Sequence, residues 1–172
     1  MMGAGRKGSG QKKACSKGGT AKGGRRGGAA SKGGRAKGGS GGRAAMKGRS
    51  ISPGKAEAEA IVSPDPIGFY GGIDAATGIV IEKGHPLEGK SVTGKVLVFP
   101  TGKGSTVGSY VIYGLAKNGV GPAAIVNRET ETIVATGAIL GGIPCVDGID
   151  VGRISTGDRL SVDADKGTVK VL

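Results

Sequence analysis

Residues 95–113 read Lys95-Val-Leu-Val-Phe-Pro-Thr-Gly-Lys-Gly-Ser-Thr-Val-Gly-Ser-Tyr-Val-Ile-Tyr113. The continuously apolar run from Val96 to Phe99 is typical of a strand that is covered on both faces, and the proline and glycines after it predict a turn. Apolar side chains then recur at helical spacing, which predicts an amphipathic helix with Ser105 at its N-cap and Gly119 near its end. This stretch therefore indicates a strand–turn–helix unit of an α/β domain.

The predicted helix carries one apolar stripe, made of Val107, Tyr110, Val111 and Leu115. Its free backbone N–H groups and its dipole converge near Ser105, an arrangement that suits either the binding of an anionic group or the stabilisation of negative charge on a serine oxygen. A purely structural interpretation stays open, in which Ser105 only caps the helix and the glycines only form a tight turn.

Charge divides the chain into two parts. Residues 1–50 contain eight Lys and six Arg with no acidic residue, whereas residues 51–172 contain eleven basic and thirteen acidic residues. The first part also holds 17 of the 38 glycines and no aromatic residue, so we predict a disordered basic tail over residues 1–50. A flexible polycation binds nucleic acid or other polyanions with little sequence preference, and a merely solubilising extension is the alternative.

Residues 51–172 are long enough for one compact domain. The expected strands cover residues 55–62, 79–82, 96–99, 123–126 and 143–146, with a hairpin of residues 159–163 and 168–172 and a second helix over residues 133–140. The order strand, helix, strand around the quoted stretch predicts a parallel pair. The fold class that we expect is therefore α/β.

Several functions are disfavoured by what this part of the sequence contains. No apolar run reaches the length of a membrane span, and the two cysteines, Cys15 and Cys145, support no disulfide framework, so a reducing cytoplasm is expected. Cys145 and the single histidine, His85, are too few for a metal site, and His85 stands in a Gly-His-Pro sequence typical of a structural turn. The spacing of a nucleotide-binding P-loop is also missing around Lys103.

Five motifs together resemble the swivel domain of the aconitase X family, from about Ile51 to the C-terminus. They read Gly72-Ile-Asp-Ala-Ala-Thr-Gly78, Gly84-His-Pro-Leu-Glu-Gly-Lys-Ser91, Gly94-Lys-Val-Leu-Val-Phe-Pro100, Gly104-Ser-Thr-Val-Gly-Ser-Tyr-Val111 and Ala135-Thr-Gly-Ala-Ile-Leu-Gly-Gly-Ile-Pro144. The resemblance implies a swivelling β/β/α domain that docks over a large subunit, which holds an iron–sulfur cluster of the 4Fe–4S type, with the active site between the two subunits. It does not extend to the basic tail.

The resemblance also implies a hydro-lyase reaction and the residues that take part in it. Ser105 falls on the family's catalytic serine, the proton acceptor of a dehydration in which iron assists the departing hydroxyl. The residues around it, Gly102, Lys103, Gly104 and Thr106, are expected to bind the substrate. The N–H groups around Gly104, Thr106 and Val107, with the helix dipole and the charge of Lys103, are expected to stabilise the serine alkoxide. The substrate implied is (R)-5-phosphomevalonate, which loses water to give trans-anhydromevalonate 5-phosphate in the archaeal mevalonate pathway.

Two alternatives remain open at this stage, and a third is disfavoured. The family resemblance also allows the small subunit of a cis-3-hydroxyproline-type dehydratase. Residues 135–172 resemble the phosphohistidine swivel domain of phosphoenolpyruvate-utilising enzymes, but Thr136 or Gly137 stands where that domain needs its histidine. Finally, the chain could be a non-catalytic protein that binds nucleic acid through residues 1–50.

Overall fold

The computed structural model describes residues 43–172, and residues 1–42 of the predicted basic tail lie outside the described residues. One mixed sheet has the strand order β1-β10-β9-β3-β5-β7-β8-β2. Its strands are β1 (Met46–Lys47), β2 (Arg49–Ser52), β3 (Lys55–Val62), β5 (Val96–Phe99), β7 (Ala124–Asn127), β8 (Cys145–Asp147), β9 (Arg159–Asp163) and β10 (Thr168–Val171). The remaining elements are α1 (Gly108–Lys117), α2 (Thr132–Gly141), the 3-10 helix η1 (Val151–Arg153) and a parallel pair of β4 (Ile67–Gly68) with β6 (Gly102–Lys103).

The sheet nearly closes on itself through its first two strands. β1 pairs with β10 and β2 pairs with β8, so two strands separated only by Gly48 lie at opposite ends of the strand order. The N–H of Gly48 donates to the carbonyl of Gly167 at 2.7 Å. A Cβ atom at this position would lie 1.9 Å from the carbonyl oxygen of Asp147, so the closure requires a glycine here.

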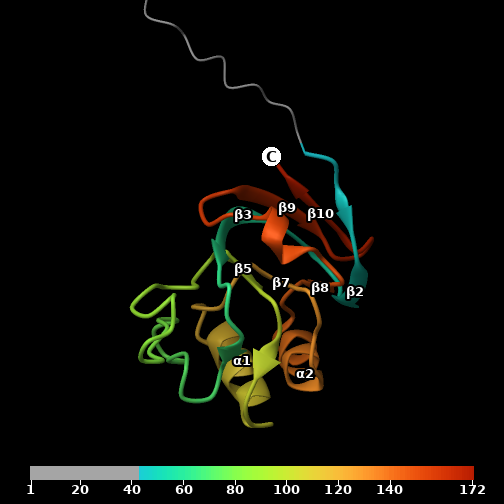
Figure 1. The fold of residues 1–172 in the computed structure, drawn as a ribbon. Helices are drawn as coiled ribbons and strands as arrows, with labels where there is room; N and C mark the ends of the chain where they lie inside the picture. Colours follow the sequence, from blue (N-terminus) through green and yellow to red (C-terminus); the bar gives the residue numbers. More distant parts are fainter. Residues whose placement is uncertain (1–42) are drawn as a thin grey trace, which may run out of the picture. The chain divides into compact units, whose positions relative to one another are not determined.

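The alternation along β5 separates two hydrophobic cores. Val96 and Val98 face a core inside the nearly closed sheet, whereas Leu97 and Phe99 face a second core beneath the two helices. All four side chains are fully buried, which explains the continuously apolar sequence. Figure 1 shows the resulting layers, with α1 and α2 on one side of β5, β7 and β8 and with β9 and β10 on the other.

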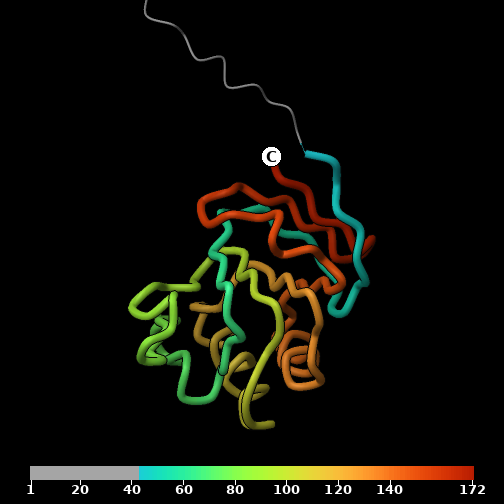
Figure 2. The backbone as a smooth tube through the Cα atoms, in the orientation of Figure 1, coloured from blue at the N-terminus to red at the C-terminus, as the bar shows by residue number. Residues whose placement is uncertain are grey.

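Most strands predicted from the pattern are confirmed. The predicted strand at residues 55–62 coincides with β3, the hairpin forms from β9 and β10, and β5 pairs in parallel with β7. The strand predicted at residues 79–82 is wrong, because this segment contributes only isolated bridges within a series of tight turns. Gly78 and Gly84, both with positive φ, bend the chain on either side of it. Figure 2 shows these turns in green and yellow-green between β4 and β5.

The sheet begins earlier than the composition predicts. β1 and the first two residues of β2 precede Ile51, where the expected domain starts, and they lie within the Gly-, Lys- and Arg-rich segment. β1 and β2 are held by backbone hydrogen bonds to β10 and β8. Such bonds do not depend on apolar side chains, so strands can form here despite the low apolar content. None of the helices in residues 43–172 is long and apolar enough to span a membrane.

Candidate functional site

The glycine-rich turn after β5 brings Ser105 to the surface in front of α1. The predicted N-cap is wrong by two residues, because Val107 occupies the cap position and makes no side-chain cap bond. A turn precedes the helix, in which the N–H of Gly108 donates to the Ser105 carbonyl at 2.8 Å. The N–H of Val107 also donates to Ser105 Oγ at 3.3 Å, so the serine oxygen still lies near the positive end of the helix dipole.

The buried face of the helix matches the predicted stripe only in part, because Leu115 is buried and Val111 packs partly against the core, as predicted, whereas the other two residues of the stripe are exposed. Ile112 and Leu115 are fully buried, while Tyr110 is 73% exposed and Val107 is 41% exposed. Tyr70 is 65% exposed, and its backbone passes close to the first turn of α1. We call these three exposed side chains around the start of α1, Tyr70, Val107 and Tyr110, the apolar rim.

Two hollows flank the turn. The first has a volume of about 350 Å³ and is lined by Tyr70, Glu82, Lys103 and four glycines that include Gly104. The second, of about 370 Å³, lies between the first turns of α1 and α2 and is lined by Thr106, Ser109, Tyr110, Thr132, Ile133 and Thr136. Ser105 therefore lies in the chain between Gly104, which lines the first hollow, and Thr106, which lines the second.

Four of the five predicted site residues are exposed on this turn. Gly104 adopts a φ of 110°, and no atom lies within 4 Å of the position where its Cβ would be, so a ligand can approach the backbone. Gly102 is the exception, because it is buried in β6 and a Cβ there would lie 2.8 Å from Val134 Cγ2. We infer that Gly102 mainly allows this close packing.

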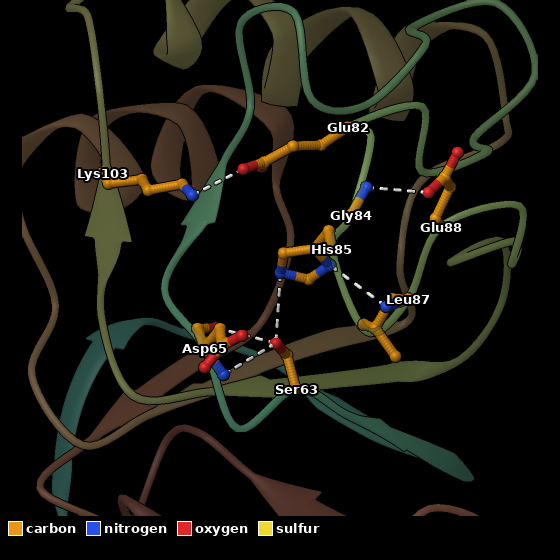
Figure 3. A network of polar contacts seen from close by, with 8 residues as sticks. All are labelled: Ser63, Asp65, Glu82, Gly84, His85, Leu87, Glu88 and Lys103. Atoms are coloured by element: carbon orange, nitrogen blue, oxygen red, sulfur yellow. Dashed lines mark hydrogen bonds and ion pairs between the residues drawn. The ribbon is translucent and has the colours of Figure 1, made fainter.

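Lys103 does not extend as a free cation. Its ammonium group donates to Glu82 Oε1 at 2.5 Å, across the first hollow (Figure 3). The sequence pattern gave no sign of this pair, because Glu82 lies 21 residues earlier in the chain, in a segment that was predicted to be a strand. Glu82 is thus a residue of the candidate site that sequence reasoning missed.

His85 occupies a structural position, as its Gly-His-Pro sequence predicts. It is 7% exposed, and its Nδ1 accepts a hydrogen bond from the N–H of Leu87 at 3.1 Å. The proton of the neutral imidazole is therefore assigned to Nε2, which lies 3.2 Å from Ser63 Oγ. The Ser63 hydroxyl donates in turn to the carbonyl of Asp65, so His85 serves Ser63 rather than Ser105.

Cys145 is fully buried in the core beneath the helices. Burial raises the pKa of its thiol to about 12, although a hydrogen bond with Thr130 has the smaller, opposite effect of lowering this pKa. The thiol is protonated at neutral pH and cannot act as a nucleophile. Within residues 43–172, no three His, Cys, Asp or Glu side chains gather in a way that could hold a metal ion.

The raised pKa of Cys145 predicts a loss of stability in alkali. The folded thiol titrates near 12 and the unfolded thiol near 9.0, so this contribution is complete below pH 9 and declines as pH rises toward 12. We expect Cys145 to account for about 2 kcal/mol of the loss between pH 7 and pH 10.5. Urea unfolding of the wild type and Cys145→Ala at both pH values measures this difference; equal losses in the two proteins would contradict it.

A family model described as "Aconitase X swivel domain" matches residues 45–171. Phosphomevalonate dehydratase small subunits are similar over 72% of this chain and 95% of their own length, with 60% identity for the protein of Thermococcus onnurineus and 60% for that of Methanocaldococcus jannaschii. The crystal structure of Thermococcus kodakaraensis aconitase X in its holo form is 57% identical with a TM-score of 0.74, over 74% of this chain and 98% of that chain. A solution NMR structure of a UPF0107 protein is 50% identical with a TM-score of 0.69, over the same shares of the two chains.

Proposed function

The chain belongs to the aconitase X swivel-domain family, and from this premise we propose that it is the small subunit of a phosphomevalonate dehydratase. The reaction would remove water from (R)-5-phosphomevalonate and give trans-anhydromevalonate 5-phosphate. The observation that carries this proposal is the 60% identity to small subunits with that name, over 95% of their length. The family model, which matches residues 45–171, also spans the Ser105 turn.

Ser105 is the proposed proton acceptor. An ordinary serine is a weak base, so its alkoxide must be stabilised before it can remove a proton from carbon. Two features of the turn support this role, namely the N–H of Val107, which donates to Ser105 Oγ, and the dipole of the ten-residue helix that follows. The proton would pass to the serine oxygen from the carbon next to the one that loses its hydroxyl, and a double bond would form between these two carbons.

The exposed residues around Ser105 are proposed to hold the substrate. Lys103 would supply a positive charge for the phosphate group, while Gly104 would let the substrate approach the backbone closely. Thr106 would contribute a hydroxyl from the neighbouring hollow. Gly102 would act indirectly, because its close contact with Val134 places β6 and the turn after it.

The iron–sulfur cluster that the family implies does not fit the described residues of this chain. In residues 43–172 no suitable group of ligands gathers, and the one cysteine is buried with its thiol pKa raised to about 12. Cluster ligands are thiolates, which this environment disfavours. We therefore assign the cluster, and the groups that assist departure of the hydroxyl, to a partner large subunit.

The test of this function is reconstitution. The chain would be combined under anaerobic conditions with the large subunit from the same source, and loss of 5-phosphomevalonate would be followed with each subunit alone and with both together. Turnover that requires both chains supports the proposal. Turnover of cis-3-hydroxyproline instead would move the chain to the other dehydratase class, and a failure to form a complex would contradict the subunit role.

We propose that the large subunit covers the apolar rim. Tyr70, Val107 and Tyr110 expose apolar area around the start of α1, next to the turn that carries Ser105, and an active site between two subunits needs such a surface to exclude water. We expect Tyr110→Asp to weaken assembly at least about tenfold, because a carboxylate would be buried at the interface. Leu172→Asp is the control, since Leu172 is 54% exposed at the C-terminus, in the layer away from the helices (Figure 1). Equal affinities of the two variants for the large subunit would contradict this placement.

Binding of polyanions by the basic segment is a separate proposal that rests on its charge. Most of this segment, residues 1–42, lies outside the described residues. A truncation that tests it must end before Met46, because removal of residues 1–50 would also delete β1 and break the closure of the sheet. With that boundary, salt-sensitive binding to nucleic acid and dehydratase activity can be assigned to different segments.

A cytoplasmic location remains a proposal drawn from the enzyme relatives.

A further inference from the structure

The side chain of Lys103 follows a defined path to Glu82. Its aliphatic part passes over Gly68, where a Cβ atom would lie 3.6 Å from Lys103 Cε. Its ammonium group then meets Glu82 Oε1 at 2.5 Å, with the two side chains 47% and 28% exposed. An ion pair with this exposure contributes little to folding stability, so stability gives no sufficient reason for its geometry.

The backbone around Glu82 is held in place by several hydrogen bonds. The carbonyl of Gly72 accepts from the N–H of Ile81 at 2.8 Å and from that of Glu82 at 3.2 Å. Gly72 itself has no space for a side chain, because a Cβ there would lie 1.9 Å from the carbonyl oxygen of Gly68 and 3.2 Å from Glu82 Oε2. The carboxylate of Glu82 is therefore directed from a fixed backbone.

The turn that follows Glu82 is anchored to the core at two points. Leu87 is fully buried beneath the helices, and His85 joins the turn to Ser63 directly after β3 (Figure 3). The N–H of His85 also donates to the carbonyl of Glu82 at 3.3 Å. These contacts connect the position of the Glu82 carboxylate to the sheet itself.

We propose that Glu82 is a positioning residue that fixes the ammonium group of Lys103 at the wall of the first hollow, which Gly104 also lines. Glu82 occupies one of the three donors of the ammonium group and leaves two for an anionic group of the substrate. A lysine that is already ordered loses less side-chain freedom when the substrate binds. This inference rests on the proposed function and assigns the substrate's phosphate to the end of the site at Lys103.

The test compares variants in the reconstituted two-subunit enzyme. We expect Glu82→Gln to raise KM for 5-phosphomevalonate about tenfold and to change kcat less than about twofold, because binding rather than chemistry is affected. Lys103→Met should raise KM at least as much, and the double variant should be no worse than Lys103→Met alone. Glu88→Gln is the matched control, since Glu88 lies in the same turn but accepts from the N–H of Gly84 instead. Its KM should equal that of the wild type.

Several outcomes overturn the inference. Additive effects of the two single variants would mean that Glu82 does not act through Lys103, and a lower KM in Glu82→Gln would mean that its charge only repels the substrate. A thermal midpoint that falls by more than about 5 °C in Glu82→Gln would indicate a structural role. If the wild type turns over and Ser105→Ala does not, the proposed function stands. Equal KM values for Glu82→Gln and Glu88→Gln would then overturn this inference alone. No wild-type turnover would overturn the proposed function with it.

Discussion

Replacement of Ser105 by alanine is expected to lower kcat of the reconstituted enzyme at least about a hundredfold, because the variant lacks the oxygen that is proposed to accept the substrate proton. KM should change little, since the neighbouring Lys103 and Gly104 remain. The structure predicts no loss of stability, because Ser105 is exposed and, within residues 43–172, its side chain makes only one long hydrogen bond, with the N–H of Val107. Steady-state kinetics and thermal unfolding of the same preparations measure these effects.

The control for this experiment is Ser155→Ala. Ser155 is also exposed, but it follows η1 on another part of the domain, and its contacts in the structure are made by its backbone. Its kcat should equal that of the wild type. Activity of Ser105→Ala within a few-fold of the wild type would show that the proton acceptor is another group, and the partner subunit would then be the place to look for it.

The second large effect is expected at Gly48. In Gly48→Ala the new methyl group would lie 1.9 Å from the carbonyl oxygen of Asp147 and 2.9 Å from Ile149 Cδ1, so β1 and β2 could not both keep their partners. We expect a loss of at least about 3 kcal/mol in the free energy of unfolding, since the overlap involves backbone that cannot move aside cheaply. Urea unfolding monitored by circular dichroism measures this loss.

Gly114→Ala provides the matched control. Gly114 lies within α1, and a Cβ there would make an ordinary contact of 3.5 Å with Ala75 Cβ. Alanine stabilises a helix interior relative to glycine, so this variant should gain about 0.5–1 kcal/mol. If Gly48→Ala unfolded at the same urea concentration as the wild type, the tight closure between β1 and β2 would not be needed for stability.

Local patterns predicted much of the sheet. The alternating residues 55–62 and the apolar residues 96–99 form β3 and β5, because half-buried and fully buried strands need different side chains on their two faces. The prediction failed at residues 79–82, where an apolar run lies between two glycines with positive φ and has no long strand to pair with. The predicted burial of Tyr110 was also wrong, since the burial of a helix face depends on what packs against it.

Sequence reasoning selected the Ser105 turn but not the contacts around it. The motif resemblance led to Ser105, and a glycine-rich turn before an apolar helix is a local feature. In contrast, the pair of Lys103 with Glu82 and the bond of His85 with Ser63 join residues 21 and 22 positions apart. No periodicity marks such pairs, because they depend on how the turns between β4 and β5 fold against the sheet.

The sequence by itself determined the local elements and the family: where apolar strands and helices lie, and which turn carries the serine. Tertiary structure alone decided the closure of the sheet by β1 and β2, the burial of Gly102, and the direction of the Lys103 ammonium group. The physical reason is that strand propensity and helical spacing act between near neighbours, whereas closure, burial and ion pairing depend on distances between segments that meet only after folding.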